Sequence, residues 1–403
     1  MSEPITPKWL LNLGVFLQEE SEGQHLWGAV FVVILLVGAV MIEASMVQPG
    51  ASATSLLEDG ETLEQASAGS NGEVLLLLDR TDSSSLRIFD SQGISEVDSG
   101  SFEPLSIDST SSGWLIGGSD GALATYDGSS FNSIEMSWLD QNPGDVISVA
   151  SNDGSSGFLI CEWDGRAKVH SFTNGNVSDG VTTSVSTTLL TDVHLSPSGN
   201  LAIVTGFDTA LGNPAFGRSG EIVYRVQTTM GDTPQMNLIH HGAGGAIHSV
   251  SFLPEGSWGG GATAMLASST STLFLLKDST IVEMNEIAGS TSAVAEESGT
   301  ILMLQGDSGV VLTMEPGAEK PSSHKLSESS IVDATHSVAL GSEVLFFGEG
   351  IEGTVGVLEI DTTADADITK SFARFGDLIF LLLVLAALVV IAQNFWVNQF
   401  QPW

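Results

Sequence analysis

The chain has 403 residues, with 49 Asp and Glu against 12 Lys and Arg, and a formal net charge of −37. This shortage of cations argues against nucleic-acid binding, because neutralising phosphate groups requires Lys and Arg. The single cysteine, Cys161, excludes an internal disulfide framework, a multi-cysteine zinc site and a cysteine-ligated iron–sulfur cluster.

Residues 1–24 predict an amphipathic or interfacial segment. Thr6 and Pro7 form a favourable helix start, and apolar residues then recur at helical spacing between Trp9 and Leu17. Such a helix would either lie on a membrane surface or dock on another subunit.

Residues 25–47 predict a first transmembrane helix. The stretch 26–42 contains no charged side chain, and its apolar continuation brings it to the roughly 20 residues that span a bilayer. The alternative is a cleaved signal peptide. The apolar run is long for a signal peptide, and Lys8 is the only cation before it.

A linker over 48–60 is expected to lead into seven repeats over 61–361. Each repeat places a glycine in a polar turn, and successive glycines lie 41 to 44 residues apart, except for one interval of 57 residues. A fixed period of this length is typical of repeat architectures. The turn glycines are Gly72, Gly113, Gly157, Gly199, Gly256, Gly299 and Gly341.

A strongly apolar strand follows each of these glycines, and a more alternating strand comes next. The first kind includes VLLLLD at 74–79 and VLFFGEG at 344–350. A small sheet with two apolar faces needs a neighbour on each side, so the pattern predicts an all-β, seven-bladed β-propeller. A β-sandwich or an open array of hairpins is the alternative.

Two segments resemble the blade opening of WD40-like propellers, namely HLSPSGNLA at 194–202 and VSFLPEG at 250–256. SDGALATYD at 119–127 and EWDGRAKV at 162–169 resemble the turn and third strand of the same repeat. The resemblance implies the propeller fold but no subfamily. The Gly-His and Trp-Asp signatures are absent, so the buried His–Asp–Trp network of WD40 repeats is not expected. Tryptophan-docking repeats are also absent, which argues against a quinoprotein dehydrogenase.

After a second linker over 362–374, residues 375–397 predict a second transmembrane helix, and 398–403 form a short tail. The run LIFLLLVLAALVVIA at 378–392 is wholly apolar. The first and last blades of a closed propeller are neighbours. The two helices should therefore leave the propeller close together.

The first strand of each blade lines the central channel, where polar side chains can converge on a site. Counting five residues back from the turn glycine gives Asp108, Asn152, His194 and His336. Aspartate and histidine are good metal ligands, so Asp108, His194 and His336 are weak metal candidates. The alternative is a set of polar residues lining a water-filled channel. A second histidine cluster comprises His240, His241 and His248.

Partner-binding candidates lie in a hairpin insertion and in a flexible turn. Phe207, Leu211 and Phe216 belong to the longest hairpin insertion, 206–220, and Trp258 stands in the glycine-rich turn 256–261. Loops on a rigid scaffold commonly carry binding residues. Cys161, in an apolar strand, is expected to pack in the core.

These features predict a membrane-anchored, non-catalytic propeller that binds or scaffolds proteins in a membrane or cell-surface complex. The expected partners are the lipid bilayer and one or more proteins. No catalytic residue and no cofactor are predicted. The alternative is a ligand-binding receptor or metal-dependent enzyme with its site at the channel mouth. Composition favours an extracytoplasmic propeller, whereas Lys370 and Arg374 favour a cytoplasmic one.

Overall fold

The computed structural model describes two compact units, residues 48–363 and the two flanking segments 1–47 and 364–403 taken together. From 48 to 366 it describes every residue except 49, 57–60, 81–82, 140–142, 212–219, 228–230, 243–244, 269, 289–291, 305–308, 319, 327–331 and 351–354. In the flanking segments it describes residues 33, 35, 38, 379–381 and 383–387.

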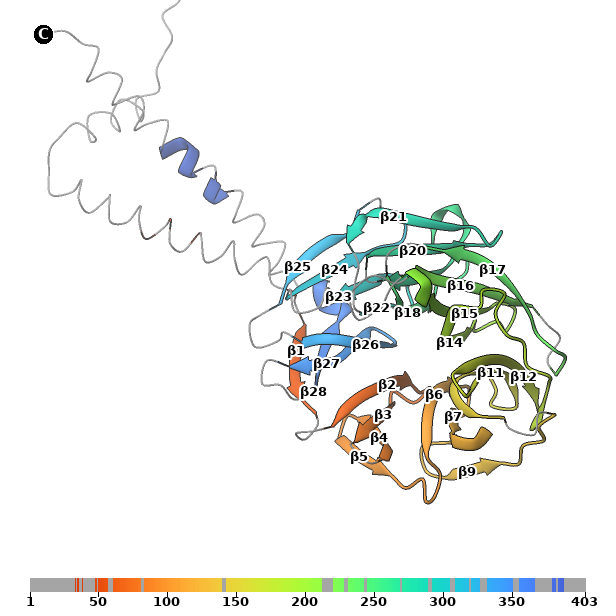
Figure 1. The fold of residues 1–403 in the computed structure, drawn as a ribbon. Helices are drawn as coiled ribbons and strands as arrows, with labels where there is room; N and C mark the ends of the chain where they lie inside the picture. The colour runs from red at the N-terminus through yellow and green to blue at the C-terminus, as the bar shows by residue number, and fades with distance from the viewer. Residues whose placement is uncertain are drawn as a thin grey trace, which may run out of the picture. The chain divides into compact units, whose positions relative to one another are not determined.

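Seven four-stranded antiparallel sheets, or blades, are arranged in a ring about a central axis (Figure 1). In blades 1 to 6 the first strand lies innermost and the others follow outward in chain order; in blade 7, β26 (Val332–Leu340) lies innermost and β1 (Ala51–Ser55) outermost. Blades 1 to 3 consist of β2 (Thr62–Ala68), β3 (Val74–Arg80), β4 (Ser83–Asp90) and β5 (Gly93–Val97); β6 (Pro104–Thr110), β7 (Gly113–Gly118), β8 (Leu123–Tyr126) and β9 (Phe131–Ile134); and β10 (Asp145–Ala150), β11 (Ser156–Trp163), β12 (Arg166–Thr173) and β13 (Asn176–Val177).

Blades 4 to 7 repeat this arrangement, which confirms the predicted seven-bladed, all-β propeller. They consist of β14 (Thr188–Leu195), β15 (Ala202–Asp208), β16 (Gly220–Gln227) and β17 (Gln235–His241); β18 (Ile247–Phe252), β19 (Ala262–Ser268), β20 (Ser271–Leu276) and β21 (Ile281–Ala288); β22 (Ser292–Ala295), β23 (Ile301–Leu304), β24 (Val310–Met314) and β25 (Ser322–Lys325); and β26 (Val332–Leu340), β27 (Glu343–Gly350), β28 (Val355–Asp361) and β1 (Ala51–Ser55).

Strand β1 comes from the N-terminal end of the propeller and completes blade 7. It pairs antiparallel to β28, from Ala51 opposite Ile360 to Ser55 opposite Gly356. The prediction of a linker over 48–60 is therefore wrong at β1, whose sequence ASATS lacks the large apolar residues of the other strands. The two chain ends of the propeller are adjacent, as expected, because the N–H of Asp361 donates to the carbonyl oxygen of Gly50 at 3.2 Å.

A hydrophobic cluster fills each of the seven interfaces between neighbouring blades in the described part of the chain. In β3, Leu75 and Leu77 pack against blade 2, whereas Leu76 and Leu78 pack against blade 7. Successive side chains of a strand point to opposite faces of a sheet. This explains why the second strands are apolar at almost every position. Cys161 is buried in the cluster between blades 2 and 3, as predicted.

Six of the seven predicted turn glycines have positive φ angles, between 63° and 137°. A β-carbon on Gly113 would lie 2.1 Å from the carbonyl oxygen of Tyr126, so no other residue fits there. Blade 3 differs, because Gly154 takes the positive φ and Gly157 lies within β11. Asn152 consequently lies beyond the end of β10, and its predicted place on the channel strand is wrong.

Most of the predicted membrane spans 25–47 and 375–397 lies outside the described residues. Those that are described are helical, yet none of the described helix is long and apolar enough to cross a membrane. The two flanking segments touch each other. A β-carbon on Gly38 would lie 2.3 Å from the ring of Phe380, so this ring occupies the space that a side chain would need.

The closure of blade 7 can be tested with a pair of substitutions in β1. Ala53 packs against the cluster between blades 6 and 7, whereas Ser52 is exposed. We expect A53D to lower the free energy of unfolding by about 1–3 kcal/mol, because it buries a charge, and S52D to change it by less than about 0.5 kcal/mol. Thermal or urea denaturation measures both. Equal effects would show that β1 contributes no packing.

Candidate functional site

The innermost strand of six blades contains a β-bulge at an equivalent position, counted over the described strand pairs. One residue of each strand drops out of the pairing with the second strand. A bulge bends the strand and re-aims the neighbouring side chains. The bulged residues are Glu64, Leu105, Ile147, Thr191, His248 and Thr335.

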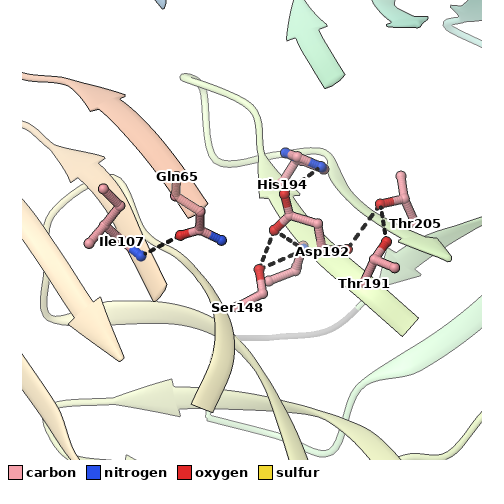
Figure 2. Close-up of polar contacts among 8 residues, drawn as sticks. Gln65, Ile107, Ser148, Thr191, Asp192, His194 and Thr205 are labelled. Carbon is pink, nitrogen blue, oxygen red and sulfur yellow. Dashed lines mark hydrogen bonds and ion pairs between the residues drawn. The ribbon is translucent and has the colours of Figure 1, made fainter. Parts of the chain in front are cut away.

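In five of the six blades the side chain after the bulge reaches the backbone of the next blade, a contact that we call a latch. Figure 2 shows one latch, in which the N–H of Ile107 donates to Gln65 Oε1 at 2.8 Å. In a second latch the N–H of Val193 donates to Ser148 Oγ at 3.0 Å. These bonds satisfy backbone and side-chain groups that would otherwise be buried without partners. Two further latches join Ser106 Oγ to the carbonyl oxygen of Val146 at 2.9 Å and the N–H of Ala293 to Ser249 Oγ at 3.2 Å.

Asp192 follows the bulge of blade 4 and lies between Ser148 and His194 (Figure 2). Its carboxylate accepts a hydrogen bond from Ser148 Oγ and another from the N–H of Val193 at 2.9 Å. His194 Nε2 lies 3.4 Å from the same carboxylate. His194, a metal candidate in the sequence, therefore pairs with an aspartate of its own strand.

Asp108 lies in β6 and bonds to blade 3. Its Oδ2 accepts the backbone N–H of Ser151 at 2.9 Å. Burial raises the pKa of this carboxyl to about 7, and the nearby charge of Asp192 acts in the same direction, while the bond from Ser151 opposes both. Both the protonated and the ionised form of Asp108 are therefore populated near neutral pH.

His336 follows the bulge of blade 7 and makes the bond to blade 1. Its ring hydrogen-bonds to the backbone of Glu64, and its Nδ1 lies 2.9 Å from Thr335 Oγ1. Burial lowers the pKa of His336 to about 4, so the ring is neutral at physiological pH. Burial also lowers the pKa of His248 in blade 5.

The described residues include no group of three or more His, Cys, Asp or Glu side chains placed to hold a metal ion. Asp108 and His336 bond to neighbouring blades, and His194 to Asp192. The structure therefore places all three metal candidates on the inner strands, but it does not gather them into one ligand set. Sequence spacing could not show this, because the bulges decide where each side chain points.

Two histidines of β17, the outermost strand of blade 4, pair with buried carboxylates of β15 and β16. His240 Nε2 lies 3.4 Å from Glu221 Oε1, and His241 Nε2 lies 3.2 Å from Asp208 Oδ2. Hydrogen bonds from Thr187 Oγ1 and a backbone N–H lower the pKa of Asp208, with a smaller contribution from His241. The predicted cluster of His240, His241 and His248 is divided, since His248 lies on the inner strand of blade 5.

The three contact residues predicted in the long insertion do not lie together on one loop. Phe207 lies within β15, half-buried, and pairs with Leu189 and Glu221. Leu211 ends a short 3-10 helix, Thr209–Leu211, and Phe216 lies outside the described residues.

Trp258 is buried rather than presented on an exposed turn. Its Nε1–H donates to the carbonyl oxygen of Gly299 at 2.7 Å, and its ring packs 5.3 Å from that of Phe274. The indole joins blades 5 and 6. It therefore contributes to the core, and the expectation of an exposed contact residue is wrong for this position.

A pocket of about 910 Å³ opens where the turns after the first and third strands meet, on blades 4 to 6, with Ala339 of blade 7 also lining it. We call it the rim pocket. Its apolar lining includes Phe252, Leu253 and Leu275, and its charged lining includes Arg225, Lys277 and Glu297. No local sequence pattern indicates this pocket, because it joins turns that lie far apart in the chain. The one signal was Arg225, a lone cation in the apolar strand EIVYRV.

No protein-family model and no curated protein matches the sequence. The seven-bladed propeller is similar in fold to several solved structures. Virginiamycin B lyase from Staphylococcus aureus is 8% identical with a TM-score of 0.52, over 77% of this chain and 99% of that one. YCF48 bound to D1 peptide is 13% identical, with a TM-score of 0.53 over 77% and 96%. A chain of the mitotic checkpoint complex is 13% identical, with a TM-score of 0.53 over 78% and 92%.

Removing one latch tests its contribution to stability. We expect S148A to lower the free energy of unfolding by about 1–2 kcal/mol, because it deprives Val193 and Asp192 of a buried partner. Ser95 is an exposed serine of an outer strand, and S95A should change stability by less than about 0.5 kcal/mol. Chemical denaturation of both variants provides the comparison. An S148A protein as stable as S95A would mean that the latches do not hold the blades.

Proposed function

We propose that this protein is a membrane-anchored, non-catalytic propeller that binds a segment of another protein in the rim pocket. The observation that carries this proposal is the pocket itself. It is large, it combines apolar and charged lining, and it opens on turns held in place by a closed ring. Binding sites typically combine apolar walls with a few placed polar groups.

The central channel is less suited to a ligand, because several polar side chains of the inner strands already have partners. The latches, the bond from Ser151 to Asp108 and the pairing of Asp192 with His194 engage inner-strand groups that a ligand would need. A ligand there would have to break bonds between blades. The rim pocket requires no such rearrangement.

Similar folds are compatible with this proposal. YCF48 is a propeller of similar fold whose structure contains a bound peptide, D1 peptide, and a further similar chain belongs to the mitotic checkpoint complex. At 13% identity these similarities concern the fold alone. They provide an example of a propeller of similar fold that binds a peptide.

Three features support anchoring through helices over 25–47 and 375–397. The ends of the propeller meet at Gly50 and Asp361, and the flanking segments touch at Gly38 and Phe380. Described apolar side chains of both segments are also exposed, with exposed fractions of 44 to 62%. Lipid would cover such side chains. The exposed residues are Val33, Ile379, Leu381, Leu383 and Leu385.

An enzyme or ligand receptor acting at the channel mouth is the second candidate. The specific observation in its favour is Asp108, because a carboxyl with a pKa of about 7 can both donate and accept a proton at neutral pH. Virginiamycin B lyase shares the fold but only 8% of the residues.

Site-specific photo-crosslinking tests the binding role. A photoreactive residue at Glu297, in the rim pocket, should yield a covalent adduct with a partner protein in native membranes. The matched control is the exposed Asp164, in a turn between second and third strands at the opposite ends of the strands. Adducts at both positions or at neither would contradict the proposal.

The anchoring and the extracytoplasmic placement of the propeller can be tested together. A protease site inserted between residues 58 and 59 should be cut in intact cells, and the full chain should resist extraction by alkaline carbonate. Protection from the protease until lysis would place the propeller in the cytoplasm. Carbonate extraction would rule out the anchors.

A further inference from the structure

Arg225 is a half-buried cation at the wall of the rim pocket, in a chain whose net charge is −37. Its side-chain Nη1–H donates a hydrogen bond to Ser279 Oγ. Among the described residues, Arg225 forms no ion pair with a carboxylate. A guanidinium carries five N–H donors in a planar fork. Several of these donors are therefore available to a group in the pocket.

Ser279 supports Arg225 from the turn between β20 and β21. Its φ angle is 69°, a left-handed conformation that glycine adopts at little cost and serine does not. The chain therefore retains a less favourable residue at this turn, and the hydroxyl it gains is bonded to the arginine. Strain of this kind is found where a side chain is needed for function.

The rest of the pocket restricts the kind of ligand. Lys277 already pairs with Glu255 at 3.2 Å, so Arg225 is the stronger site for an anion. Glu296 and Glu297, from the turn after β22, also line the pocket and can accept N–H groups. With the apolar lining, this arrangement suits a peptide that combines a carboxylate, backbone N–H donors and an apolar side chain.

We propose that the rim pocket binds a peptide segment through a carboxylate, to which Arg225 donates a bidentate pair of hydrogen bonds. Ser279 helps to position the guanidinium of Arg225. This inference rests on the proposed function, since it specifies the ligand of the same pocket. Paired hydrogen bonds between arginine and carboxylate are strong and geometrically specific. The carboxylate can come from an acidic side chain or from the end of a chain.

Three small probes test this chemistry on the detergent-solubilised full chain by saturation-transfer NMR. They are N-acetylalanylleucine, its C-terminal amide, and N-acetylaspartylleucinamide. We expect at least one acidic probe to bind about tenfold more tightly than the neutral amide, as a charge-assisted hydrogen bond predicts. The tighter acidic probe identifies the source of the carboxylate. Equal binding of all three, or no binding, would overturn the inference.

Two variants assign the preference to the proposed residues. R225Q should abolish the preference for the acidic probe. S279G should reduce it severalfold while leaving the melting temperature unchanged or higher, because glycine relieves the turn. This opposite effect on binding and stability would not result from simple misfolding. The matched control is R166Q, at an exposed arginine of β12 outside the pocket, which should keep the preference. An S279G protein with full preference, or a folded R225Q protein that retains it, would contradict the proposal.

The probes and the crosslinking experiment can fail independently. An adduct at Glu297 with no carboxylate preference would leave the binding role intact and overturn only the chemistry proposed for Arg225. The absence of both would overturn the proposed function as well.

Discussion

Every sheet in this protein is apolar on both faces, and this constraint determines the architecture. A sheet with two apolar faces is covered only when another sheet packs on each side. Seven such sheets satisfy the condition by closing into a ring, with one hydrophobic cluster at each interface. Strand β1 serves the same purpose in blade 7. Without it, the cluster that contains Leu358 and Ile360 would lose its packing against Ala51 and Ala53.

The inner strands meet a different requirement, because they converge on the channel, where polar backbone groups at the bulges need partners. Gln65, Ser106, Ser148 and Ser249 supply them to the next blade. WD40 repeats are known for a His–Asp–Trp network, whereas here short polar side chains after the bulges connect the blades. Since these groups are engaged, we place recognition of another molecule in the rim pocket, on the turns after the first and third strands.

The second and third strands were predictable from sequence, because strands buried on both faces are apolar at most positions and are separated by turn glycines. The inner strands were less predictable. Gly154 replaces Gly157 as the turn residue of blade 3, and this three-residue shift misplaced Asn152. Trp258 appeared exposed because glycines surround it, yet its indole N–H found a carbonyl group in the next blade. The rim pocket could not be predicted, because its walls come from turns of different blades and no local pattern joins them.

The pairing of β1 with β28 also determines how the ring responds to mechanical load. Both chain ends, at Gly50 and Asp361, lie at the same end of this antiparallel pair. Tension that pulls the ends apart would therefore act on the hydrogen bonds one after another, as a zipper opens, and would not load them all in shear. A ring closed by seven shared hydrophobic clusters would then open at a comparatively low force when its two chain ends are drawn apart.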